Sequence, residues 1–114
     1  MSLFARNGIA FSFREAGSGM PFIFQHGLGG DAAQTFALVT PPAGVRMITL
    51  ECRGHGETRP FGAPEHLRFD TFADDVVALM DHLGLGRAVL GGISMGAGVA
   101  LNLACRYPER VRAP

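Results

Sequence analysis

The sequence predicts an α/β protein in which an antiparallel hairpin precedes parallel strands joined by crossover helices. Three short runs, at residues 22–24, 47–50 and 88–90, are almost continuously apolar, which is typical of parallel strands covered on both faces. Segments with helical periodicity separate these runs, and that alternation indicates an α/β sheet. A chain of 114 residues is long enough for one domain.

The hairpin is predicted at the start of the chain. Asn7 and Gly8 form the dipeptide preferred in type I′ turns. After this turn, Ile9, Phe11 and Phe13 alternate with small or polar residues, as in a half-buried strand. We therefore expect two antiparallel strands at about residues 2–6 and 9–15.

Two helices are predicted between the apolar runs. Asp31 can cap a helix that ends near Val39, and Thr71 can cap the next one, with Asp74 in capping-box position. Gly84 stands where a helix would end in the left-handed conformation. The second helix should bury one face, made of Phe72, Val76, Leu79, Met80 and Leu83. The methionines Met47 and Met80 and the phenylalanines are expected in the core.

Composition restricts the possible partners. The chain has 10 basic and 10 acidic residues, so no basic excess attracts nucleic acid or an anionic membrane. The first residues lack the apolar segment of a signal peptide, and no apolar run approaches the roughly 20 residues of a membrane span. Cys52 and Cys105 form neither a disulfide framework nor a metal-ligand spacing. We expect a cytoplasmic protein without a metal site, whose oligomeric state the sequence leaves open.

The most informative motif follows the third apolar run. Residues 92–96 read Gly-Ile-Ser-Met-Gly, which matches the G-x-S-x-G pattern of a nucleophile elbow. In such a strand-to-helix turn the serine hydroxyl is exposed above the sheet, and the flanking glycines avoid collisions that a Cβ would cause. A helix-compatible segment with small residues follows, so the sequence context supports the elbow.

Glycine clusters also follow the two other apolar runs. His26-Gly27-Leu28-Gly29 comes after the first, and residues 51–58, Glu-Cys-Arg-Gly-His-Gly-Glu-Thr, come after the second. With the serine elbow, these segments resemble the α/β-hydrolase superfamily at three points in the family's order. The resemblance covers essentially the whole chain. Glu51 stands where the family usually has Asp and Thr58 where it usually has Ser, and neither position is catalytic in the family.

The resemblance implies a hydrolase with Ser94 as nucleophile, acting through an acyl-enzyme on a small-molecule ester, lactone or similar carbonyl substrate. The backbone amides of Leu28 and Met95 would form the oxyanion hole. A serine at the elbow, instead of an aspartate, argues against the haloalkane and epoxide branches of the family. The resemblance implies no cofactor.

The triad acid and histidine are not found in their expected order, which is Ser, then Asp or Glu, then His. After Ser94 there is no histidine or aspartate, and Glu109, the only acid, belongs to the segment that leaves the last helix. We therefore expect residues 1–114 to be the N-terminal part of a single α/β-hydrolase domain, without its C-terminal strands. On this interpretation the 114 residues alone are inactive.

Alternatives remain at several residues. His26 or His55 could be a base, although local hydrogen bonding within their glycine loops is the simpler interpretation. Arg53 is expected to hold its own loop. Residues 27–32 also fit the G-x-G-x-x-A fingerprint of a Rossmann-type dinucleotide-binding domain of an oxidoreductase, with Glu51 as the ribose-binding acid. A non-catalytic binding protein that keeps the hydrolase fold is a third possibility.

Overall fold

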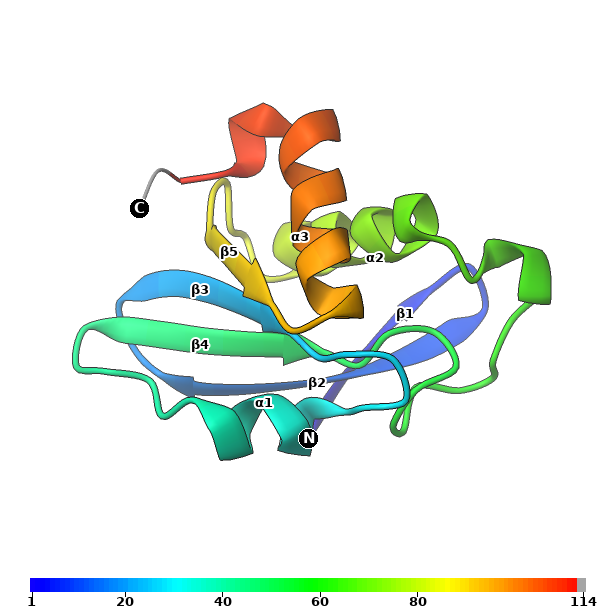
Figure 1. Cartoon of the computed structure of the whole chain (residues 1–114), viewed down its shortest axis with the longest axis horizontal. Coiled ribbons are helices and arrows are strands. Elements are labelled where there is room, and N and C mark those ends of the chain that lie inside the picture. The colour runs from blue at the N-terminus through cyan, green and yellow to red at the C-terminus, as the bar shows by residue number, and fades with distance from the viewer. Residues whose placement is uncertain (113–114) are drawn as a thin grey trace.

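The computed structural model describes residues 1–112. Five strands form one mixed sheet in the order β1-β2-β4-β3-β5 (Figure 1). β1 pairs with β2 and β2 with β4 antiparallel, whereas β3 pairs parallel with both β4 and β5. The strands are β1 (Ser2–Arg6), β2 (Ile9–Gly17), β3 (Met20–Gln25), β4 (Val45–Leu50) and β5 (Val89–Gly92). The predicted α/β class, with a hairpin ahead of parallel strands, is confirmed.

The helices form a layer on each face of the sheet. α1 lies on one face, and α2 and α3 pack together on the other (Figure 1). Two short 3₁₀ helices, η1 and η2, complete the fold. The bounds are α1 (Ala32–Leu38), η1 (Pro64–His66), α2 (Phe69–His82), α3 (Met95–Arg106) and η2 (Pro108–Arg110).

The first turn has the backbone that the sequence predicts. Asn7 and Gly8 both have positive φ, 52° and 78°, as a type I′ turn requires. The turn places Arg6 opposite Ile9. β2 then runs two residues further than expected, to Gly17, because this end pairs with β4 and so joins the hairpin to the parallel strands.

The core lies mainly between the sheet and the α2–α3 layer. The predicted face of α2 is confirmed, since four of its five residues are buried and Leu83 packs against the core at its edge. Met47 and Met80 are fully buried, but the expectation for the phenylalanines is only partly correct, since Phe61 and Phe69 are 56% and 47% exposed. Members of the core cluster include Phe11, Phe13, Ile23, Ile48, Leu50, Val76, Leu79, Met80, Val99 and Leu103.

The predicted start of α2 is wrong. The helix begins at Phe69 with Arg68 as N-cap, and no side chain caps it. Contacts with α3 explain the earlier start. The Phe69 ring lies so close to Gly98 that a Cβ there would be 2.6 Å from it, and the carbonyl oxygen of Asp70 accepts a hydrogen bond from Arg106. In contrast, Asp31 caps α1 as predicted, and Gly84 adopts positive φ after α2.

β5 is the last strand of the sheet in the described part of the chain. In the described residues its only strand partner is β3, and Ala88, the residue before it, forms a single parallel bridge with Val111. Within residues 1–112, no helix is long and apolar enough to cross a membrane. The same residues contain no group of three or more His, Cys, Asp or Glu side chains that could hold a metal ion.

Candidate active site

The three glycine clusters meet at the carboxyl ends of the parallel strands. From β3 the chain leads to α1 on one face of the sheet, and from β5 it leads to α3 on the opposite face (Figure 1). The loops after these adjacent strands therefore diverge, and residues of both loops, Leu28 and Ser94, line one cavity. Crevices at such switch points are the usual ligand sites of α/β sheets.

Ser94 occupies a strained turn between β5 and α3. Its φ is 52° and its ψ is −111°, a conformation that costs free energy for a residue with a side chain. The flanking glycines make the turn possible. A Cβ on Gly92 would strike the backbone of Gly96, and a Cβ on Gly96 would lie 2.7 Å from the carbonyl oxygen of His26 and closer still to that of Gln25. Ser94 itself is exposed.

The structure brings all three predicted site residues to one cavity. Leu28, Ser94 and Met95 line a cavity of about 540 Å³. Gly27 lies directly beneath, since a Cβ there would be 3.6 Å from Ser94 Cβ.

Two backbone N–H groups at this cavity have no partner. Within residues 1–112, neither the Leu28 nor the Met95 amide donates a hydrogen bond to backbone or side chain. Met95 is the first residue of α3, where a helix leaves its N–H groups unpaired. Leu28 and Met95, which line the cavity with the exposed Ser94, therefore each carry an unpaired amide N–H.

The other side chains of the cavity are mainly apolar. Leu67, Phe69 and Phe72 line it together with Arg68 and His55. Sequence patterns placed Phe72 on the buried face of its helix and gave no indication that Leu67 or Phe69 would face the serine. The first turn of α2 reaches the site through its packing on α3, and that contact has no local signal.

His26 is committed to holding two loops together. It is fully buried, and its Nδ1 lies 2.8 Å from the Gly27 carbonyl oxygen, so Nδ1 carries the proton and donates. Its Nε2 accepts the N–H of Cys52 at 3.0 Å. Burial lowers the pKa of His26 below its ordinary value of 6.5, because the imidazolium ion would lose its hydration. The ring is thus a neutral structural link.

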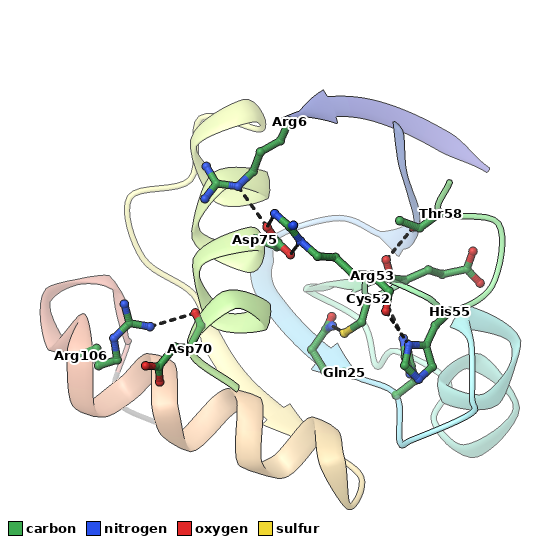
Figure 2. Close-up of polar contacts among 11 residues, drawn as sticks. Arg6, Gln25, Cys52, Arg53, His55, Thr58, Asp70, Asp75 and Arg106 are labelled. Atoms are coloured by element: carbon green, nitrogen blue, oxygen red, sulfur yellow. Dashed lines mark hydrogen bonds and ion pairs between the residues drawn. The ribbon is translucent and has the colours of Figure 1, made fainter. Parts of the chain in front are cut away.

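His55 also bonds within its own segment. Its Nδ1 lies 2.9 Å from the carbonyl oxygen of Arg53, and its ring is tilted by 42° to that of His26, with the two ring centroids 4.9 Å apart. Figure 2 shows His55 beside these loops. The simpler interpretation, in which both histidines hold their glycine loops, agrees with these contacts.

Side-chain bonds hold β3 and β4 together where their backbone ladder ends. The amide of Gln25 donates to the Leu50 carbonyl and accepts the Leu50 N–H, both at 2.9 Å, and it also donates to Cys52 Sγ (Figure 2). Burial raises the pKa of the Cys52 thiol to about 12, so this thiol is an unreactive part of the framework. The loop that carries Leu28 starts from this fixed point.

The two departures from the family motif are accommodated by hydrogen bonds. Glu51 accepts the N–H groups of Ala32 and Glu57, which joins the loop after β4 to the start of α1. Thr58 Oγ1 donates to the Glu51 carbonyl at 2.7 Å and accepts the N–H of Ser12 (Figure 2). The Glu51 carboxylate is therefore committed to the protein backbone.

Arg53 holds its loop to α2, as expected. Its Nε and Nη2 donate to the two carboxylate oxygens of Asp75, at 2.7 and 3.1 Å, in a buried pair (Figure 2). The loop after β4 is thereby attached to the helix that forms one wall of the cavity.

Comparison with known proteins shows the family. The family described as alpha/beta hydrolase fold matches residues 20–113. The non-heme chloroperoxidase CPO-A1 of Kitasatospora aureofaciens is 39% identical over 95 residues, which are 82% of this chain and 34% of the relative.

Solved structures agree with this match. Est816, described as an N-acyl homoserine lactone degrading enzyme, superposes with a TM-score of 0.81 at 30% identity, over 96% of this chain and 42% of Est816. Epoxide hydrolase VrEH1 from Vigna radiata superposes with a TM-score of 0.83 at 29% identity, over 98% and 37% of the two chains. The chain thus spans less than half the length of each of these relatives.

The family match also bears on the two interpretations of residues 27–32, as an α/β-hydrolase loop or as a dinucleotide-binding loop. It includes residues 27–32, on which the dinucleotide-binding alternative depended, and Glu51, the acid required by that alternative, already binds two backbone N–H groups. The dinucleotide-binding alternative is therefore not supported. The chain belongs to the α/β-hydrolase fold family.

Proposed function

We propose that this chain supplies the nucleophile and the oxyanion hole of a serine hydrolase that cleaves an ester, lactone or similar carbonyl substrate. The observation that supports this most strongly is the arrangement around Ser94. An exposed serine in a strained turn lines one cavity with Leu28 and Met95, whose amide N–H groups have no partner in the described chain.

The chemistry follows from these groups. Ser94 Oγ attacks the carbonyl carbon of the substrate and gives its proton to a general base. The carbonyl oxygen becomes an oxyanion that accepts hydrogen bonds from the amides of Leu28 and Met95. The positive N-terminal end of the 12-residue helix α3 also favours this charge. The alcohol leaves with the proton, and water then hydrolyses the acyl-enzyme.

The general base and its acid partner belong, on this proposal, to a part of the protein outside these 114 residues. Both ring nitrogens of His26 are bonded, so that ring has no free site for a proton from Ser94. His55 lines the cavity with its Nδ1 bonded to its own loop, and within residues 1–112 no hydrogen bond joins its ring to Ser94. The limited coverage of the relatives is consistent with a base supplied from elsewhere.

The cavity favours a substrate with an apolar acyl group. Leu28, Leu67, Phe69, Phe72 and Met95 surround the serine, and these side chains gain free energy by excluding water from an alkyl chain. The lactone-degrading relative Est816 is consistent with this substrate class. The serine at position 94 separates this chain from the epoxide branch, in which the family resemblance implies an aspartate.

Turnover of a simple activated ester by the intact protein tests the proposal. Ser94→Ala should lower kcat/KM by about 10⁴-fold, as loss of a triad member does in other serine hydrolases. Leu28→Ala should keep most of the activity, because the backbone amide, and not the side chain, is proposed to act. The control is Ser18→Ala, an exposed serine in the loop before β3. Near-normal turnover by Ser94→Ala would refute the assignment.

The similarity to CPO-A1 supports a second candidate. At 39% identity, the relative's named chloroperoxidase activity could extend to this protein. The same three variants should therefore be assayed for substrate chlorination. Chlorination that exceeds ester hydrolysis and depends on Ser94 would favour this second function.

A further inference from the structure

A second cavity lies away from the serine, at the side of the molecule where the first hairpin meets the loop after β4. Its volume is about 520 Å³, and it shares no lining residue with the candidate active site. Arg6, Arg53 and His66 line it together with Asn7 and Thr71. We call it the basic cavity, because its ionisable lining residues are these two arginines and one histidine.

The charges beneath the basic cavity do not balance. Asp75, which is buried, is the carboxylate that both arginines bind (Figure 2). Arg6 Nε and Arg53 Nη2 approach the same oxygen, Asp75 Oδ1, at 3.0 and 3.1 Å. Two guanidinium ions therefore share one carboxylate. The two guanidinium ions carry one positive charge more than this carboxylate, and the Arg6 side chain, which is 33% exposed, leaves that excess charge accessible to a second anion.

Arg53, which lines the basic cavity, also has an unused donor. Its side chain is 5% exposed, and its Nε and Nη2 are both used by Asp75. Within residues 1–112 the Arg53 guanidinium bonds through Nε and Nη2, and Nη1 makes no hydrogen bond. Asp75 holds the guanidinium plane rigidly, so the free Nη1 is directed without further ordering. An N–H donor held in this way suits one oxygen of a planar or tetrahedral anion.

Asp75, which lies beneath the two arginines, is the carboxylate nearest to this place, and it does not line the cavity. Among residues 1–112, neither an aspartate nor a glutamate lines the basic cavity. Asn7 and Thr71 add neutral donors, and Arg6, with a side chain 33% exposed, can turn its Nη groups toward a ligand.

We propose that the basic cavity binds a small oxyanion, a carboxylate or phosphate group, between Arg6 and Arg53. The bound anion would neutralise the positive charge of Arg6 and Arg53 that the Asp75 carboxylate leaves uncompensated. This site is independent of the acyl-transfer chemistry proposed for Ser94, because no residue lines both cavities.

Titration of the intact protein with inorganic phosphate and, separately, with acetate tests this proposal. Calorimetry and ¹⁵N NMR of the arginine Nε–H groups should be run at constant ionic strength with chloride as the balancing anion. We expect saturable binding with shifts at Arg53 and Arg6. Tighter binding of phosphate would identify a phosphate site, and tighter binding of acetate a carboxylate site.

Matched variants separate this site from general surface charge. Arg6→Gln should weaken binding at least fivefold while leaving the Arg53–Asp75 pair in place. Arg87→Gln removes an exposed arginine outside the cavity and should leave binding unchanged. Arg53→Gln would break the buried Arg53–Asp75 pair and could unfold the protein. The part that Arg53 plays is therefore tested by the NMR shifts of its Nε–H in the unmodified protein. Absence of saturable binding by both anions, or equal weakening in Arg6→Gln and Arg87→Gln, would overturn the proposal.

Discussion

At the scale of single residues, the turn at Ser94 requires residues without a side chain at positions 92 and 96. Gly96 has no room for a Cβ, which would strike the carbonyl oxygens of Gln25 and His26. These oxygens belong to the end of β3 and the start of the loop after it, so the collision would disturb the loop that carries Leu28. Gly86 offers the matched comparison, since a Cβ there would have nothing within 4 Å.

The first prediction at this scale compares these two glycines. Gly96→Ala should lower the free energy of unfolding by about 1–3 kcal/mol, the usual cost of overpacking. Gly86→Ala should change it by less than about 0.5 kcal/mol, as is usual at surface positions. Urea unfolding of the intact protein measures both values. Equal stabilities of the two variants would show that Gly96 does not contact β3 as described.

A second prediction concerns the pH dependence of stability. Burial lowers the pKa of His26 in the folded state, whereas in the unfolded chain this pKa has its ordinary value of 6.5. Below about pH 6.5 the unfolded chain therefore binds more protons than the folded protein does. The free energy of unfolding should therefore decrease as the pH falls below 6.5 and should gain nothing from His26 above it. In His26→Gln this part of the pH dependence should disappear. If the free energy of unfolding of His26→Gln changed with pH between 6.5 and 5 as steeply as that of the unmodified protein, the prediction would be wrong.

At the scale of elements, the starts of α1 and α2 depend on different forces. Asp31 caps α1 locally, by accepting the N–H of Gln34 at 3.1 Å. α2 has no side-chain cap, and its first turn is held by α3 through Phe69 and Asp70. Thr71, the N-cap expected from the sequence, lies within the helix.

This difference predicts opposite effects of two alanine substitutions. Asp31→Ala should lower the free energy of unfolding by about 1 kcal/mol, because it removes an N-cap bond. Thr71→Ala should be neutral or slightly stabilising, because alanine is the better residue inside a helix. Thermal unfolding of both variants makes the comparison. A larger loss in Thr71→Ala would mean that α2 begins where the sequence pattern suggested.

The same contrast explains which elements could be predicted. Asn7-Gly8, Asp31 and Gly84 act through their own backbone or the next few residues, so their patterns are visible in the sequence. Phe69 takes its place because a glycine 29 positions later leaves space for its ring. The serine, Leu28 and Met95 could be proposed from motifs, whereas Leu67 and Phe69 could not, because their place at the cavity depends on how α2 packs on α3.

At the scale of the whole molecule, the strand order creates the site. β3 lies between β4 and β5, and the loops after β3 and β5 lead to opposite faces of the sheet (Figure 1). Sequence patterns indicated parallel strands but contained no information on this order, since continuous apolar runs are alike. The order matters because it brings Leu28, from the loop after β3, and Met95, at the start of α3, to the same cavity.

Covalent labelling of the intact protein with a fluorophosphonate tests the central claim most directly. The reagent reacts with a serine hydroxyl only when a base and an oxyanion hole activate it. We predict one adduct, located by mass spectrometry on the peptide that contains Ser94. It should be absent in Ser94→Ala and unchanged in Ser18→Ala. Absence of an adduct on Ser94, or equal labelling of the Ser94→Ala variant, would contradict the assignment of Ser94 as the nucleophile.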